Sequence, residues 1–452
     1  MDAVTVETGA CASLAWRSIA ANQSEPGCGG SAVEFTQTEG GHRGGYLMTV
    51  TTSKAESAGW GSIFLVYCYG LLAIASAGKM APIAADMGKA LGSSPQEIGW
   101  IIGLLFIAPT LGSTLGGSAV DRYGARPMLA GACVLIVIAN AICYISDSLG
   151  LIEAARLIEG IGFVAITAAA PSLLIMTTSG KRQTGAMALW STYFAAGISA
   201  GLLLAAPFSA TEHWRLPFVI HGAAAAGLAL SVGLLPVPGQ TSRGTAGNDD
   251  ALRAVIGESG VLRLAAAFAI LTIAGFGVNI VMPQYMAKTL GVSVSMGSAA
   301  VAISNIASIC GGILTGFLLS RGHSFKLVAA TISVLACMAS ISLFLPQSSV
   351  TLTIVSLMVW GFATPGTMVA VVMIMIPRVL KNTAIVGLAN GVVVQSGSAA
   401  AFFVPAIYFS LLANGIWWYF ALLGLACVIF ALITLLTIQP TGGMIDDGAN
   451  IH

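Results

Sequence analysis

The sequence predicts an all-α membrane protein with about twelve transmembrane helices. Only 8% of its 452 residues are charged, against about a quarter in soluble domains, and 56% are hydrophobic. Charged side chains are scarce in such proteins because each costs on the order of 3 kcal/mol at the bilayer centre. The 54 glycines agree with this class, since small residues let membrane helices pack closely.

Twelve apolar stretches follow one another from Trp60 onward, each about as long as the 20 residues that cross the hydrocarbon. Only short breaks separate them, which predicts a bundle of antiparallel neighbours. The stretches are 60–84, 96–120, 127–147, 150–177, 184–207, 214–235, 261–285, 295–319, 327–346, 350–376, 384–410 and 416–438.

The segment before the first helix differs from the rest of the chain. Residues 1–57 are rich in Gly, Ser, Thr and Glu and contain no apolar run, so we expect a disordered cytoplasmic tail rather than a signal peptide. Because Met48 stands where such proteins usually begin, we hypothesise that residues 1–47 reflect an upstream misreading of the start codon. Native protein that begins before Met48 in mass spectrometry would contradict this.

The positions of Lys and Arg predict the orientation in the membrane. Fourteen of the nineteen face the cytoplasm if the N-terminal tail is cytoplasmic, and the other five lie in helices or outer loops. With an even number of helices, both termini are then cytoplasmic, in a bacterial inner membrane. The five exceptions are Lys79, Lys89, Arg156, Arg215 and Lys288.

A shift of about 200 residues superimposes landmarks of the two parts of the chain. Pro82 falls on Pro283, and beyond a slightly shorter outer loop three more residues match. These are Gly112, Gly117 and Arg122, which fall on Gly311, Gly316 and Arg321. The repeat predicts two related six-helix halves. The boundaries are 58–236 for the first half, 237–258 for a cytoplasmic central loop, 259–440 for the second half and 441–452 for a cytoplasmic tail.

The most specific motif lies in the predicted inner loop between the second and third helices. It reads Gly117-Ser-Ala-Val-Asp121-Arg122-Tyr-Gly124-Ala-Arg126. It resembles the loop motif of the major facilitator superfamily, in which a glycine stands four residues before Asp-Arg-x-Gly-x-Arg. Gly117 allows close helix approach, Gly124 allows a tight turn, and Asp121 can pair with basic groups when the inner side closes. We therefore interpret the motif as an ionic latch rather than a loop that is charged only for topology.

The predicted fourth helix carries three charges at three-residue steps. Glu153, Arg156 and Glu159 share one helix face, so Arg156 can pair with either glutamate. Counting from the outer end, Arg156 is about two turns deep and Glu159 about three. The spacing Arg156-x-x-x-Gly160-x-Gly162 is similar to the superfamily's helix 4 motif, where the arginine is associated with proton transfer or anion binding. A purely structural ion pair is the alternative.

A carboxylate that couples transport to protons must lie in the first half, because residues 260–444 contain no Asp or Glu. Glu159 and Glu153 are the deepest candidates. His221 is the only histidine inside an apolar run, where it either bonds two helices together or titrates.

Lys79 is the third charged position at depth. The helical pattern continues past it to about Ala90, so Lys79 either lies deep and needs a partner such as an anionic substrate, or snorkels to the outer surface. Asn279 occupies the matching stretch of the second half and suits the other end of a substrate. Four more polar residues either line a cavity or join helices. They are Tyr67, Asn305, Asn390 and Gln395.

The resemblance covers nearly the whole chain from Met48 to Gln439. Within the superfamily, the run from Arg156 to Pro171, the stretch Ala188-Leu-Trp190-Ser and a cation three residues before a proline are most similar to the cyanate and nitroimidazole permease branch. That branch usually has arginine where this chain has Lys79. Drug–proton antiporters typically carry a Gly-Pro pair in the fifth helix, and this sequence has none there.

The resemblance implies a secondary transporter with its substrate between the halves near mid-membrane. We expect proton-linked symport of a small, anionic organic solute, in which Glu159 or Glu153 takes up a proton as substrate binds at Lys79 or Arg156. The alternatives are an efflux antiporter for amphipathic drugs or metabolites and a non-transporting sensor with the same fold.

The sequence has no nucleotide-binding glycine loop, metal-ligand cluster or nucleophile–base spacing. We therefore predict no enzymatic activity, no cofactor, no metal and no nucleic-acid partner. The expected partners are the solute, protons and the lipid bilayer, and we expect a monomer.

Overall fold

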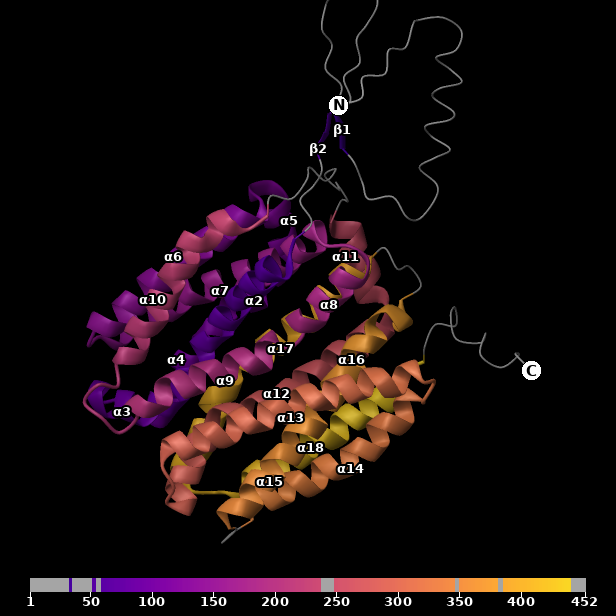
Figure 1. Cartoon of the computed structure of the whole chain (residues 1–452). Helices are drawn as coiled ribbons and strands as arrows, with labels where there is room; N and C mark the ends of the chain where they lie inside the picture. Colours follow the sequence, from indigo (N-terminus) through magenta and orange to yellow (C-terminus); the bar gives the residue numbers. More distant parts are fainter. Residues whose placement is uncertain are drawn as a thin grey trace, which may run out of the picture.

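The computed structural model describes residues 32–34, 51–53, 58–236, 248–345, 349–380 and 385–439. Long helices form two bodies that lie side by side, one indigo to magenta and the other orange to yellow in Figure 1. The prediction of an all-α membrane fold in two halves is confirmed. The helices of the first half are α2 (Trp60–Gly78), α3 (Met80–Leu91), α4 (Pro95–Gly103), η1 (Leu104–Phe106), α5 (Ile107–Tyr123), α6 (Ala125–Ile145), α7 (Leu149–Thr177), α8 (Gly180–Trp190), α9 (Tyr193–Ala205), η2 (Ala206–Phe208), α10 (Leu216–Ser231) and η3 (Val232–Leu234).

The second half repeats this arrangement after a short connecting helix. Its helices are α11 (Asn248–Gly257), α12 (Ser259–Leu290), α13 (Val294–Ser320), α14 (Phe325–Leu343), α15 (Val350–Gly361), η4 (Phe362–Met368), α16 (Val369–Met375), η5 (Ile376–Val379), α17 (Val386–Asn414) and α18 (Trp418–Leu436). In the N-terminal segment, β1 (Ala32–Glu34) pairs antiparallel with β2 (Thr51–Ser53). The rest of the predicted tail lies outside the described residues.

Eleven described helices are long and apolar enough to cross a membrane, and a bent pair makes up to twelve. The bent pair is α8 followed by α9 and η2, with an angle of 42° at the break. At this break the hydroxyls of Ser191 and Thr192 donate to the carbonyls of Ala188 and Leu189, at 2.7 and 2.8 Å. Such local bonds compete with the helical ladder, which explains why the predicted stretch 184–207 is broken.

The central segment 237–258 was predicted as a loop, and its described part contains α11. The sequence of α11 is rich in helix formers, and Val255 is buried while Arg253 is exposed. The helix contacts α12 and α17. A short amphipathic helix therefore lies against the second half.

Hydrogen bonds between helix ends show which ends share a side. Ala58, just before α2, donates to Thr177 O at the end of α7, at 2.9 Å. Arg263 near the start of α12 donates to Thr437 O just after α18. We call the side of the bundle that holds these ends the terminal side, and the opposite side the far side.

The two halves are packed together on the far side, where the helices beside the boundary are buried. All residues 72–84 of α2 and α3 and all residues 274–283 of α12 are buried. Nearer the terminal side, Trp60 and Phe64 of α2 are 56% and 58% exposed. Across the boundary on the far side, Gln284 donates to the carbonyl of Pro82 at 2.9 Å. The structure is therefore closed toward the far side.

A seven-residue π-helix interrupts the tenth span. It runs from Phe362 to Met368 and contains Pro365, a residue type that kinks or breaks a helix when it lies inside one. Proline removes one backbone donor, and the wider π-turn accommodates this loss. By contrast α7 continues through Pro171 without a break.

Candidate functional site

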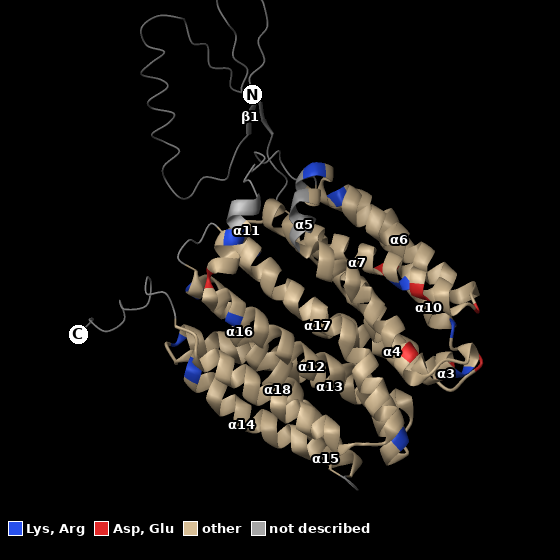
Figure 2. Cartoon of the chain, turned by 180° about the vertical axis from the view of Figure 1, so that it is seen from behind, with Lys and Arg blue, Asp and Glu red and all other residues tan. Residues whose placement is uncertain are grey.

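The candidate site is a group of buried polar side chains inside the first half, which we call the charge cluster. Figure 2 shows most Lys, Arg, Asp and Glu near helix ends, with basic and acidic residues also within the first half beside α7 and α10. Four spans contribute: the junction of α2 and α3, α6, α7 and α10. The members of the charge cluster are Lys79, Asn140, Arg156, Glu159 and His221.

Lys79 is fully buried, so it does not snorkel to the surface. Its ammonium donates to Glu159 Oε1 at 2.6 Å and to Asn140 Oδ1 at 2.7 Å, and it lies 2.9 Å from His221 Nδ1. The ring of Phe218 lies 5.2 Å from the ammonium. Because an ammonium has three N–H donors, these three acceptors saturate it.

Arg156 and Glu159 form an ion pair one helical turn apart, and both side chains are buried. Arg156 Nη1 donates to Glu159 Oε2, and Nε donates to Ile101 O of α4 at 3.2 Å. Nη2 is buried and has no hydrogen-bond partner among the described residues. Of the two glutamates that the sequence allows as partners, the structure pairs Arg156 with Glu159, while Glu153 is half-buried.

His221 and Asn140 complete the cluster as neutral groups. His221 Nε2 lies 3.0 Å from Leu72 O, which can only accept, so Nε2 carries the hydrogen and Nδ1 presents its lone pair to Lys79. Asn140 Nδ2 donates to Ile136 O at 2.7 Å, which turns Oδ1 toward Lys79. The cluster therefore holds two cations and one carboxylate, an excess of one positive charge.

Glycines let the backbones come close enough for these bonds. A Cβ on Gly201 of α9 would lie 2.7 Å from Lys79 N, and one on Gly160 of α7 would lie 2.5 Å from Leu105 O. Neither distance is sterically allowed. These glycines therefore fix the spacing of the helices around Lys79 and Glu159.

The cluster lies in the far half of the membrane. Glu159 is ten residues from the start of α7, or about 15 Å at 1.5 Å per residue. Asn140 and His221 are each five residues, about 8 Å, from the far ends of α6 and α10. The cluster is thus on the side where the two halves are closed.

Two of the other predicted polar residues join the halves instead of converging on the cluster. Asn305 Nδ2 donates to Ser199 Oγ at 3.0 Å, and Gln395 Nε2 donates to Thr110 O. Each bond links the second half to the first. In this conformation they hold the boundary closed.

The remaining predicted polar residues lie apart from one another. Tyr67 bonds within the first half, with its hydroxyl 2.8 Å from Thr192 Oγ1. Asn279 is buried and donates to Gly275 O of its own helix at 3.1 Å, while Asn390 is exposed near the start of α17.

The predicted latch lies at the end of α5. Gly124 has φ +82°, as the predicted tight turn requires, and Arg122 lies over the Tyr123 ring at 5.3 Å. Arg126 donates to Val232 O at 3.0 Å, which ties the loop to the end of the sixth span. The surroundings of Gly117 and the side chain of Asp121 lie outside what the structure describes, so pairing of Asp121 stays a prediction.

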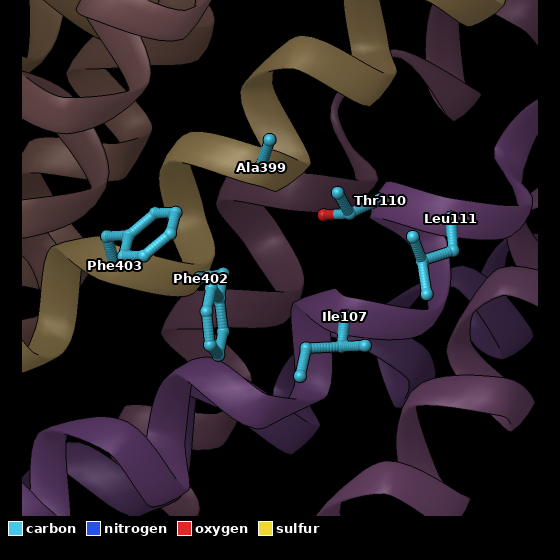
Figure 3. Close-up of a pocket in the computed structure, with 6 residues that line it drawn as sticks. All are labelled: Ile107, Thr110, Leu111, Ala399, Phe402 and Phe403. Atoms are coloured by element: carbon cyan, nitrogen blue, oxygen red, sulfur yellow. The ribbon is translucent and has the colours of Figure 1, made fainter.

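A pocket of about 200 Å³ lies between α5 and α17, and Figure 3 shows its lining side chains pointing into it. None of its lining residues is charged, and the one hydroxyl, of Thr110, donates to Phe106 O at 2.6 Å. The pocket therefore offers no group that would bind an anion. Its lining is Ile107, Thr110, Leu111, Ala399, Phe402 and Phe403.

Comparison with known proteins identifies the family. The sequence profile of the Major Facilitator Superfamily matches residues 63–405. This chain belongs to the major facilitator superfamily. The inward-open xylose transporter XylE from E. coli superposes with a TM-score of 0.68 at 16% identity, over 85% of this chain and 97% of that one, which confirms the fold.

The curated relatives match only parts of the chain. The methylenomycin A resistance protein of Bacillus subtilis is 29% identical over 35% of each chain, and the niacin transporter NiaP of Acinetobacter baylyi is 32% identical over 19% of each. The chain spans about a third or less of the length of these relatives. Members of the family are transporters rather than enzymes, and the relation to the cyanate and nitroimidazole permease branch stays a prediction.

Sequence reasoning missed Asn140. The available signal was a single amide in the otherwise apolar helix α6, a polar group that must find a partner in a membrane. It also left the role of His221 open, and the structure makes it an acceptor for Lys79.

Proposed function

We propose that this protein is a secondary active transporter that carries a small organic anion by alternating access. The supporting observation is the free Nη2 of Arg156, a buried donor without a partner in a cluster with one excess positive charge. Leaving a buried donor unpaired costs about 1–3 kcal/mol, which a bound carboxylate would recover. Lys79 is saturated by its three acceptors, so Arg156 is the stronger candidate for direct contact with the anion, and Lys79 sets the charge balance.

Glu159 is the candidate for proton coupling. Its two oxygens are shared by Lys79 and Arg156, so a proton on Glu159 would free both cations for another anion. If a proton and a monovalent anion enter together, the net charge of the cluster is unchanged. This avoids the large cost of adding charge to a buried site.

We assign the terminal side to the cytoplasm, in a bacterial inner membrane, because most Lys and Arg then face inward. The closed far side is then the outer side, and the charge cluster lies just beneath it. Rocking of the halves would break the contact of Gln284 with Pro82 and open a path from outside. If the proton and the anion both enter the charge cluster from the outside, the transport cycle is uptake by symport.

Residues of the second half and of the latch fit the same cycle. Asn279, Asn305, Asn390 and Gln395 would supply neutral hydrogen bonds to the solute or hold the closed boundary. Asp121 would hold the cytoplasmic side when the outer side opens.

A second candidate is proton-coupled efflux of amphipathic compounds. It is favoured by the apolar character of the pocket between α5 and α17, and by relatives whose names refer to resistance and multidrug export. Such a carrier would not need Arg156 to contact its cargo. The two candidates therefore differ in their dependence on Arg156.

The test is thermal stabilisation of the purified protein by carboxylates (pyruvate, benzoate), by tetraphenylphosphonium and by glucose. Ligands that bind the folded state stabilise by mass action, so millimolar concentrations reveal micromolar binders. We expect carboxylates to stabilise the wild type but not Arg156→Lys, because a lysine ammonium lacks the rigid fork of N–H donors with which the guanidinium contacts Ile101 O, Glu159 and a further carboxylate. Arg215→Lys at the far surface is the matched control. If tetraphenylphosphonium stabilises the wild type and Arg156→Lys equally, this result would favour the efflux function.

A further inference from the structure

Six aromatic side chains form a connected series at the boundary of the halves, which we call the ring chain. Five come from the first half and one, Phe276, comes from α12. In order along the chain, the members are Trp190, Tyr193, Phe194, Phe276, Phe106 and Phe163.

Phe276 is the centre of the ring chain. Its ring meets Phe106 at 5.1 Å and 75°, and Phe194 at 6.3 Å and 64°. Phe106 in turn meets Phe163 at 5.9 Å and 69°. These are edge-to-face contacts, the geometry that the ring quadrupole favours. The second half thus places one ring between two rings of the first, Phe106 and Phe194.

The ring chain ends beside the charge cluster. Phe163 lies four residues after Glu159 and seven after Arg156 on α7, so all three share one helix face. The axial separations are about 6 and 10 Å. On the neighbouring span, Phe106 directly follows Leu105, whose carbonyl meets Gly160 of α7. The ring of the series that is nearest in sequence to Arg156 therefore lies about two helical turns from it on the same face of α7.

The other end of the ring chain lies at the break between α8 and α9, where Trp190 is buried. Tyr193 and Phe194 are half-buried, whereas Phe106, Phe163 and Phe276 are buried. Trp190 stacks on Tyr193 at 4.6 Å. Aromatic contacts therefore continue from partly accessible rings to the charge cluster.

We propose that the transported anion is an aromatic carboxylate. Its ring would pack among Phe106, Phe163 and Phe276, and its carboxylate would bind Arg156 Nη2. This inference rests on the proposed function and adds the substrate class to it. A saturated ring of the same size fills the same space but lacks the quadrupole that gives edge-to-face contacts their extra stability.

The test compares benzoate with cyclohexanecarboxylate, two carboxylates of similar size that are both ionised at neutral pH. Dissociation constants are measured by calorimetry on the purified full-length protein. We expect benzoate to bind about three- to tenfold more tightly, the value of one edge-to-face contact. In Phe276→Leu and Phe106→Leu this ratio should fall close to one, while cyclohexanecarboxylate still binds. Phe344→Leu removes a buried ring that stacks on Phe420 within the second half, outside the ring chain, and it should keep the wild-type ratio.

The outcomes separate the two proposals. Equal affinity of the wild type for the two carboxylates would overturn the aromatic assignment and leave the anion transporter standing. Binding of neither, with stabilisation by a lipophilic cation, would overturn both. If the leucine variants lower the melting temperature but keep the preference for benzoate, the rings only pack the boundary. The ratio of the two dissociation constants in the wild type tests the aromatic assignment even if one variant fails to fold.

Discussion

The ammonium of Lys79 and the carboxylate of Glu159 lie 2.6 Å apart, although 80 residues separate them in the sequence. Both side chains are withdrawn from solvent, at 0% and 1% exposure. Removing two charges from water is so costly that a hydrophobic pair of similar volume is often at least as stable. Stabilisation of the fold alone therefore does not explain why this buried ion pair is present. A role in transport would explain it, which supports the assignment of the charge cluster to transport.

We expect Lys79→Met alone to destabilise the protein by about 3–5 kcal/mol, because Glu159 Oε1, Asn140 Oδ1 and His221 Nδ1 lose the buried ammonium that bonds to all three. Glu159→Gln alone should also destabilise, since two cations then lack a counter-charge. The double variant should be more stable than the sum of the two effects predicts. Melting temperatures of the four proteins in detergent provide this cycle.

The comparison variant is Lys288→Met, whose ammonium donates to Leu412 O without an acidic partner among the described residues. It should lower the melting temperature less than Lys79→Met. Strictly additive effects of Lys79→Met and Glu159→Gln would show that the two charges do not interact, contrary to the geometry.

Much of the fold could be predicted because membrane insertion leaves a local record in the sequence. The apolar stretches gave the spans to within several residues. The helical pattern beyond Lys79 allowed a deep position for this residue but did not exclude snorkelling, and the structure shows that it is buried. The three-residue spacing of Arg156 and Glu159 brings them onto one face in any helix. Each of these features is determined by a single segment of the sequence, without reference to how the helices pack.

The partners of Lys79 could not be predicted, because Asn140 and His221 lie on other spans whose rotation depends on packing. The bend between α8 and α9 was also missed, since Ser191 and Thr192 interrupt the helix only through their own hydroxyls. For Gln395 the sequence left open whether it lines a cavity or joins helices, and its bond to Thr110 O depends on how the halves dock. The partners of Lys79, the bend and the bond of Gln395 all depend on how the helices pack in three dimensions.

Glu159→Gln should remove the pH dependence of anion binding. In the wild type, a proton on Glu159 would free Arg156 and Lys79 for the ligand, so the affinity for benzoate should rise as pH falls from 8 to 5.5. Glutamine carries no charge and resembles the protonated state, so its affinity should be high and flat over this range. Calorimetric titration with benzoate at several pH values measures this. An unaltered slope in Glu159→Gln would place the proton site elsewhere, and Glu153→Gln would be examined next.

Asp121→Asn should slow transport and leave binding largely intact. A latch acts on the rate of closing at the cytoplasmic side, whereas the charge cluster is far from the end of α5. We expect uptake of a radiolabelled carboxylate into proteoliposomes to fall several-fold, with an unchanged dissociation constant. Full transport activity in this variant would contradict the latch assignment.

Gly103→Ala should weaken closure of the far side. A Cβ at Gly103 would lie 2.0 Å from Phe402 O, so α4 must move away from α17. Alanine is also the better helix former by about 1 kcal/mol, so an opening effect would come from the steric contact and not from a weakened helix. Gly112→Ala is the matched control, because nothing lies within 4 Å of its Cβ position. Spin labels at Lys89→Cys and Met296→Cys, with the native cysteines replaced, report the separation of the halves at this end. We expect a population with longer distances in Gly103→Ala only, and identical distributions in both variants would show that this contact does not control closure.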